Sequence, residues 1–394
     1  MSDRAQRELD ARLRRIASVA RLLPALTARH GRSERLRLIR ALESGARMEP
    51  RLAAEPQRVP RSVWRDLDEA RVLAPQSEAA ELHFARLDEL ELELTLMEVL
   101  GEPRRVRPMA ARLFGTGDQP VRYEGEPMRL AEAANRILET LHGRAEPPSL
   151  PSAGEVSAAA LMHAVAERVG LRIEVEVEPR LVADAAAGER TLFLAERRFG
   201  AREARRLAAH EILGHLVAAA NGRAQPLALL SVGTADSFTD QEGLALALEE
   251  RAGLMSDHRK RTLAARVWVT DRMHDGATFE STVRHLANEL GFSSGEAVAL
   301  GERAWRGGGL ARDAAYLFGW LRVRDALDGG HATIDELRLG RVSLAALPTL
   351  RRMLERGTIR PGPFQPSLDC VHDAAPAIRS PDPQLRDTAL TLED

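Results

Sequence analysis

Apolar residues recur every three or four positions over most of the first hundred residues, and this spacing predicts helices. Pro24 ends the first of them, a second is expected over residues 33–42, and a long third over residues 79–100 is expected to end at Gly101. We interpret these helices as a region that packs its own apolar faces together, in preference to a binding surface. The apolar face of the first helix is formed by Leu9, Leu13, Ile16, Val19, Leu22 and Leu23.

The pattern changes after Gly101. Residues 102–150 show no clear period, so irregular structure is expected there, and residues 144–155 are typical of a linker or a long surface loop. A helix ending at Gly170 should follow. Residues 171–179 alternate apolar and charged side chains, which predicts a strand with one solvated face, and residues 190–196 predict a second, short strand.

The chain then returns to helical spacing as far as about residue 360. The expected fold class is therefore α+β and mainly helical, with a small β-sheet. The helices expected in this part cover residues 201–222, where Asn221-Gly222 is the stop, residues 240–253, a helix opened by a capping box from Ser293 to Glu296, and residues 310–327 after the glycines of RGGG. Three consecutive segments follow from this pattern: an N-terminal helical region over residues 1–150, a domain with the strands over 151–360, and an irregular C-terminal tail over 361–394.

Composition narrows the classes of protein that the chain can be. It has 394 residues, of which 29% are charged and 44% apolar, values typical of a soluble globular protein. The net charge of −2 argues against nucleic acid or an anionic membrane as the main partner. The N-terminus lacks the apolar core of a signal peptide, and no apolar run reaches the length of a membrane span, so a cytoplasmic location is the default expectation.

A single cysteine, Cys370, excludes a disulfide within the chain and a zinc site made mainly of thiolates. A metal site would therefore use histidine and carboxylate ligands. The segment HEILGH, residues 210–215, offers two histidines, but they are five positions apart instead of the four of the H-E-x-x-H signature. On a regular α-helix the second imidazole would point about 140° away from the first. The pair is then either a coincidence inside an ordinary helix or the sign of a deformed one.

Three features favour the deformed helix. A π-type turn has the i to i+5 spacing of His210 and His215, and Gly214 relieves crowding where the backbone must widen. Strands precede the helix, as expected for a zinc hydrolase. The next helix offers Glu242 as an acidic ligand, although a capping box from Thr239 would explain Glu242 equally well.

Glu249 lies seven residues after Glu242 and shares its helix face. It is therefore either a rival metal ligand or the partner of an imidazole N–H.

Four motifs in order carry a resemblance to a known family. After H-E-x-x-x-H come N-G-x-x-Q-P-L at residues 221–227, QEGLA at residues 241–245, and RGGGLARDAAYL at residues 306–317. With these motifs the chain resembles the QEGLA-motif family, once described as flavohaemoglobin expression-modulating proteins, whose eukaryotic relatives are the microtubule-associated tyrosine carboxypeptidases. The resemblance extends weakly from residue 21 to about residue 358. One departure is the position of Gly214, which the family more often has one residue earlier.

The resemblance implies a zincin-like catalytic domain in which His210, His215 and Glu242 bind Zn²⁺ and Glu211 is the catalytic carboxylate. Glu211 would take a proton from the activated water and pass it to the leaving amine. The implied enzyme is a zinc metallocarboxypeptidase that releases a C-terminal residue, aromatic in the relatives, from a peptide or protein. The alternatives are a regulatory or binding protein with a structural or vestigial zinc site, and a zinc hydrolase of non-peptide amides.

Residues outside the ligand set complete the expected site. Tyr316 is a candidate for stabilising the oxyanion, with a buried helical tyrosine as the alternative. The glycines of RGGG would expose backbone N–H groups at the start of a helix, unless they are only a flexible connection. The sequence predicts no oligomeric state. Candidate residues for binding the substrate are Arg303, Arg306, Arg312 and Gln225, and those for supporting the metal ligands are Glu249 and Asn221.

Overall fold

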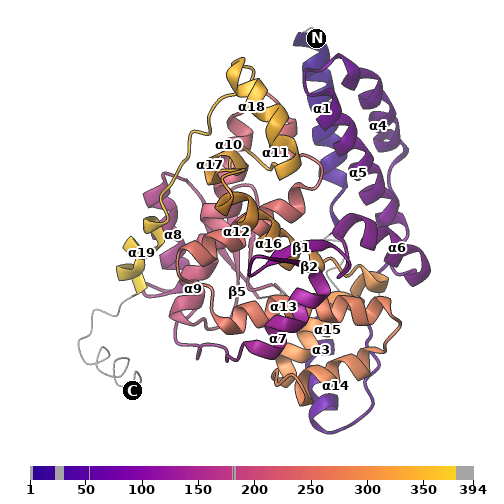
Figure 1. Cartoon of the computed structure of the whole chain (residues 1–394), viewed down its shortest axis with the longest axis vertical. Coiled ribbons are helices and arrows are strands. Elements are labelled where there is room, and N and C mark those ends of the chain that lie inside the picture. The colour runs from indigo at the N-terminus through magenta and orange to yellow at the C-terminus, as the bar shows by residue number, and fades with distance from the viewer. Residues whose placement is uncertain (1–2, 23–30, 53, 180, 182, 379–394) are drawn as a thin grey trace. The chain divides into compact units, whose positions relative to one another are not determined.

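The computed structural model describes residues 3–22, 31–52, 54–179, 181 and 183–378, and helices predominate in them (Figure 1). The expected α+β, mainly helical class is confirmed. The chain forms two compact units, each assembled from three stretches. The first unit comprises Met1–Arg144, Ala218–Ala247 and Ser256–Pro363, and the second Ala145–Val217, Leu248–Met255 and Phe364–Asp394. The three consecutive segments expected from the sequence stay a prediction.

The N-terminal helices form as the apolar spacing predicts. Helix α1 (Asp3–Val19) runs alongside α4 (Arg61–Leu73) and α5 (Ala80–Glu98) in the first unit (Figure 1). Helix α3 (Gly31–Glu43) confirms the second predicted helix, whereas Leu23 and Pro24 lie outside the described residues. The buried core that joins α1, α4 and α5 includes Leu9, Leu13, Ile16, Val63, Leu67, Leu87, Leu90 and Leu94.

Regular structure occupies most of residues 102–150, so the expectation of an irregular segment is wrong. Helix α6 buries an apolar residue every fourth position, a pattern that the sequence already shows. A hairpin follows, and its turn at Glu124-Gly125 takes positive φ angles of 52° and 82°. Residues 115–119, between α6 and the hairpin, and most of residues 141–157 are without helix or strand. The elements are α6 (Pro103–Phe114), β1 (Pro120–Tyr123), β2 (Glu126–Arg129) and α7 (Leu130–Thr140).

The second unit contains the small sheet. Helix α8 (Ala158–Val169) ends at Gly170, which takes the left-handed conformation, as predicted. Both predicted strands are present, β3 (Glu174–Glu178) and β5 (Thr191–Ala195), and they pair in parallel. Strand β4 (Ala185–Ala187) pairs antiparallel with β5 and is not predicted, because three alanines show no alternation.

One uninterrupted helical segment carries the HEILGH motif. It consists of α9 (Ala201–Ala208), the π-helix η2 (Ala209–Leu216) and α10 (Val217–Ala224). The predicted stop at Asn221-Gly222 is wrong, because the helix continues to Ala224. Gly222 is needed for packing, since a Cβ atom there would lie 2.4 Å from the carbonyl oxygen of Leu230.

The remaining described elements are helices. Within the predicted C-terminal tail, two short helices precede residues 379–394, which lie outside the described residues. No helix of the described segments is long and apolar enough to cross a membrane. The remaining helices are η1 (Ala74–Gln76), α11 (Leu229–Val232), α12 (Ser237–Arg251), α13 (Asp257–His274), α14 (Phe279–Asn288), α15 (Ser294–Gly309), α16 (Ala314–Asp328), α17 (Ile334–Leu337), η3 (Leu344–Ala346), α18 (Leu347–Glu355), α19 (Asp369–Asp373) and η4 (Ala375–Ile378).

Candidate functional site

The helix widens at HEILGH, as the spacing of its histidines predicts. Residues Ala209–Leu216 form a π-helix, whose wider turn places residues five apart over one another. The Nε2 atoms of His210 and His215 lie 3.3 Å apart, and the ring centroids are 4.9 Å apart with the planes at 79°. The two imidazoles therefore converge on one point, which a straight α-helix would prevent.

Glu249 fixes the orientation of His210. Its Oε1 atom accepts a hydrogen bond from Nδ1 of His210 at 2.8 Å and another from Nη1 of Arg206 at 3.1 Å. Because a carboxylate can only accept, Nδ1 of His210 carries a proton, and in the neutral form of the ring Nε2 keeps its lone pair. Of the two roles expected for Glu249, its position matches that of the imidazole partner.

Arg206 was not among the residues expected from the sequence. It lies one helical turn before His210, and only 8% of it is exposed. An arginine on the apolar, buried side of a helix needs a carboxylate partner. The position of Arg206 on that side is the sequence feature that could have identified it.

Helix α12 carries the expected acidic ligand, Glu242. It begins at Ser237, so Thr239 lies inside the helix and does not occupy the N-cap position that the alternative for Glu242 requires. His210, His215 and Glu242 each offer one ligand atom, and the three atoms lie within 4.8 Å of one another. Glu211 follows the first histidine in the π-helix and is 6% exposed.

A pair of glycines brings the backbones of α12 and α16 close together. A Cβ atom on Gly243 would lie 2.2 Å from the carbonyl oxygen of Gly319, and one on Gly319 would lie 2.1 Å from that of Thr239. The rings of Phe238 on α12 and Tyr316 on α16 meet edge to face, with centroids 6.1 Å apart. The glycine of QEGLA is therefore required for helix packing.

The amide side chains of N-G-x-x-Q-P-L bind backbone groups. Nδ2 of Asn221 donates to the carbonyl oxygen of Arg338 at 2.8 Å. Nε2 of Gln225 donates to the carbonyl oxygen of Arg360 at 2.6 Å, and its Oε1 accepts from the amide of Arg360 at 3.0 Å. Both amides are buried. The roles expected for Gln225 toward the substrate and for Asn221 behind the ligands stay predictions.

Two polar residues at the start of α12 also form hydrogen bonds with backbone groups. Nε2 of Gln241 donates to the carbonyl oxygens of Leu337 at 3.0 Å and Val342 at 2.8 Å. The carboxylate of Asp240 accepts from the backbone amide of Leu344 at 2.7 Å. Burial raises the pKa of Asp240 to about 6. These bonds tie the segment around residues 337–344 to α12.

The candidate arginines surround Tyr316 and Asp313. Arg303 holds Asp313 through two hydrogen bonds, one from Nη2 to Oδ1 at 2.7 Å and a second from Nε to Oδ2. Burial alone would raise the pKa of Asp313, but the positive charges of Arg303 and Arg266 outweigh it and hold this pKa well below its usual range. Nη2 of Arg312 donates to the Tyr316 hydroxyl at 3.3 Å.

Arg266 on α13 is a member of this cluster that the sequence did not indicate. Its guanidinium carbon lies 4.8 Å from the centroid of the Tyr316 ring. Burial, followed by the charge of Arg303, lowers the pKa of Arg266 to about 10, and the same two causes lower that of Arg306 to about 10.

The glycines of RGGG do not lead directly into a helix. Gly307, Gly308 and Gly309 have φ angles of 68°, 85° and 96° and form the kinked end of α15. Helix α16 begins only at Ala314. The carbonyl oxygen of Gly307 accepts a hydrogen bond from the amide of Gly101 at 3.0 Å. The expectation of amides exposed at a helix start is therefore wrong.

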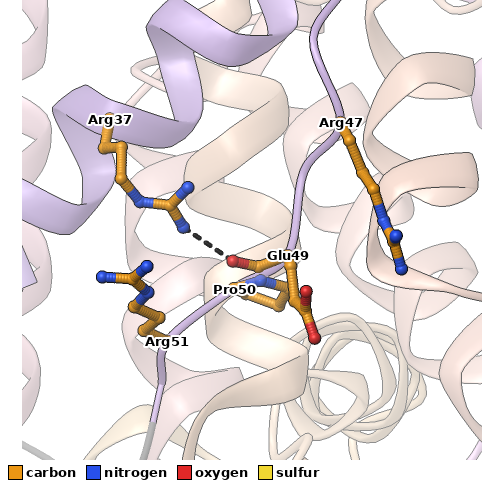
Figure 2. Close-up of a pocket in the computed structure, with 5 residues that line it drawn as sticks. All are labelled: Arg37, Arg47, Glu49, Pro50 and Arg51. Carbon is orange, nitrogen blue, oxygen red and sulfur yellow. Dashed lines mark hydrogen bonds between the residues drawn. The ribbon is translucent and has the colours of Figure 1, made fainter.

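A separate hollow on the first unit contains none of the expected site residues. Figure 2 shows three arginines around it, and Nη2 of Arg37 donates to the carbonyl oxygen of Glu49 at 2.6 Å. Arg37 also pairs with the buried carboxylate of Glu34 at 2.7 Å. The hollow is lined by Arg37, Arg47, Glu49, Pro50 and Arg51.

Comparison with known proteins agrees with the motifs. No curated protein matches the sequence. The family model described as microtubule-associated tyrosine carboxypeptidase matches residues 41–377, which is most of the chain and includes η2, α12 and the arginine cluster. A peptidase of the carboxypeptidase type is the activity that this match implies. The chain therefore belongs to the family of microtubule-associated tyrosine carboxypeptidases.

Proposed function

We propose that the chain is a zinc-dependent metallopeptidase of the zincin type that removes the C-terminal residue of a peptide or protein. The observation that carries the proposal is the convergence of His210 and His215 across the π-helix. The activity for which the family is named gives the reaction type. An aromatic residue at the substrate C-terminus is the preference that this name suggests.

The donor atoms fit zinc. Two nitrogens bound to one tetrahedral zinc at about 2.0–2.1 Å would lie about 3.3 Å apart, and the Nε2 atoms of His210 and His215 are separated by 3.3 Å. Nδ1 of His210 faces the carboxylate of Glu249, so Nε2, on the other side of the ring, points away from Glu249 and can bind a metal. We assign Glu242 as the third ligand, because its carboxylate lies within the same group. Two imidazoles and one carboxylate are a ligand set of catalytic zinc sites.

Glu211 is the residue that we assign to proton transfer. A zinc ion held by His210, His215 and Glu242 would supply an acidified water and polarise the substrate carbonyl group. Glu211 adjoins His210 in a buried part of η2, so it would accept the proton of the attacking water and hand it to the leaving amine. Tyr316 would donate its hydroxyl proton in a hydrogen bond to the oxyanion.

Recognition of the terminal carboxylate falls to the arginine cluster. Arg303 is already bound to Asp313 and positions that carboxylate, so we assign the substrate contact to Arg306 and Arg312. Guanidinium groups bind carboxylates through paired hydrogen bonds.

The test combines a catalytic variant with a substrate library. Glu211→Gln should keep one zinc per chain and lose hydrolysis, and an undiminished rate would rule out the mechanism. Mass spectrometry of a degenerate peptide library after incubation with the zinc-loaded protein should show loss of single C-terminal residues. The same peptides with an amidated C-terminus should remain intact. Zinc-loaded protein that cleaves nothing would favour the alternative, a regulatory or binding protein with a structural or vestigial zinc site.

A further inference from the structure

The cluster around Tyr316 holds more positive than negative charge. Arg266, Arg303, Arg306 and Arg312 act on one another or on Asp313, and Asp313 is the carboxylate that affects the first three. Asp313 is 2% exposed and already binds Arg303 with both oxygens. Asp313 thus faces three guanidinium groups, those of Arg266, Arg303 and Arg306, and among the described residues it binds directly only that of Arg303. The fourth arginine, Arg312, joins the cluster through Arg306 and the Tyr316 hydroxyl.

A second acidic residue near the cluster is already paired with an arginine outside it. Glu302 is close enough for the charge of Arg306 to affect its pKa, but its carboxylate is bound by Arg35 at 2.6 Å. This pair is neutral by itself and adds no negative charge to the cluster. The positive surplus of the cluster therefore persists when Glu302 is included.

Two guanidinium groups also have unused hydrogen-bond donors. The Nε atoms of Arg266 and Arg312 are buried and have no hydrogen-bond partner among the described residues. A buried donor on a charged group without an acceptor costs free energy, because water no longer solvates it.

Contacts with aromatic rings offset only part of this free-energy cost. Arg266 lies 4.8 Å from the ring centroid of Tyr316, and Arg312 lies 5.0 Å from that of Phe238. Such contacts attract a cation to a ring face, but they neither remove its charge nor accept its in-plane N–H groups.

We propose that this cluster is a binding site for a small monovalent anion, a carboxylate or a halide, which occupies it when no peptide is bound, and that Arg266 is one of its ligands. An anion would accept the unused N–H groups and offset the surplus charge. The inference rests on the proposed function only where it predicts competition with the substrate carboxylate. The anion site itself requires neither zinc nor hydrolysis.

The experiment measures thermal unfolding of the full chain in increasing sodium acetate or sodium chloride. Ionic strength is held constant with the sodium salt of a bulky sulfonate. The unfolding temperature should rise and saturate with acetate or chloride, because a ligand that binds the folded state stabilises it by mass action. Tighter binding of acetate would identify a carboxylate site, and tighter binding of chloride a halide site. No rise with either anion would overturn the proposal.

Arg266→Met should weaken the apparent anion affinity at least about tenfold, since it removes a charge-assisted hydrogen bond. Arg47→Met is the matched control, because it removes the same charge from the exposed hollow of Figure 2. It should leave the affinity unchanged, and equal affinities of the Arg266 and Arg47 variants would contradict the assignment. If Arg266→Met does not fold, the wild-type titration still decides whether the site exists, and Arg306→Met replaces it as the test of the cluster.

A metal-ligand variant separates the two proposals. His210→Ala should abolish zinc binding and leave the anion affinity as in the wild type. A protein that binds acetate but hydrolyses no peptide would sustain the anion site and overturn the proposed function. Active enzyme whose unfolding temperature does not rise with acetate or chloride, and whose rate neither anion affects, would overturn the anion site alone.

Discussion

Replacement of Gly243 by alanine tests the contact between α12 and α16. A Cβ atom on Gly243 would lie 2.2 Å from the carbonyl oxygen of Gly319 and 2.4 Å from its carbonyl carbon. These are backbone atoms of a neighbouring helix, so rotation of a side chain cannot relieve the clash. The helices would have to separate, and Val323, whose Cγ2 would be 2.9 Å away, would have to move with α16.

Two effects of opposite sign decide the magnitude. Alanine is about 1 kcal/mol better than glycine inside a helix. Overpacking of a close contact costs about 1–3 kcal/mol, and a contact with rigid backbone belongs at the upper end of that range. We therefore expect Gly243→Ala to lower the free energy of unfolding by about 2 kcal/mol.

Urea denaturation followed by circular dichroism measures this loss as a shift of the midpoint. Gly295→Ala is the matched control, because Gly295 lies in α15 and its added Cβ would meet nothing within 4 Å. Because Gly295 lies in the first turn of α15, the control should change the free energy of unfolding by less than about 0.5 kcal/mol. A Gly243 variant as stable as the Gly295 variant would refute the close approach of the two helices.

Three further substitutions test the charges of the site and of the core. Glu249→Gln should weaken zinc binding about 10–100-fold by loosening His210; competition with a chelator measures this, and an unchanged affinity would contradict it. Burial raises the pKa of Asp271 to about 6, so its ionised form destabilises the fold and stability falls as pH rises from about 4 to 6. Asp271→Asn should therefore gain about 1–3 kcal/mol in urea midpoints at pH 7.5, and this gain should vanish by about pH 4. Asp313→Asn leaves the charge of Arg303 unpaired and should cost about 3–5 kcal/mol in the same denaturation assay; a loss below about 1 kcal/mol would show that the pair is not a buried one.

The sequence predicts the features that depend on local spacing. The interval between His210 and His215, with Gly214 between them, favours the π-turn together with the strands before the helix and the acidic residue after it, because the helical period fixes which residues share a face. The alternation of residues 171–179 likewise predicts β3.

Prediction from the sequence fails where contacts between distant segments determine the role of a residue. Arg266 lies on α13, and its neighbours come from α15 and α16, so no local pattern distinguishes it from a surface arginine. The hairpin of β1 and β2 was missed for a local reason. Its turn is Glu124-Gly125, where a non-glycine residue takes a φ of 52°, and such a turn lacks the usual Asn-Gly or Asp-Gly sequence.

The five residues of QEGLA show why a motif indicates a site without assigning roles. Gln241 donates hydrogen bonds to two backbone carbonyl oxygens, and Gly243 permits the close approach of α12 and α16. Leu244 and Ala245 are buried in the core. Glu242 alone is placed to bind a metal. The consequence is measurable: Gln241→Ala should lower both the urea midpoint and the activity, whereas Glu242→Gln should lose zinc affinity with a midpoint matching that of the metal-free wild type. A zinc affinity that survives Glu242→Gln would remove the motif's carboxylate from the metal centre and leave all five positions with roles in packing.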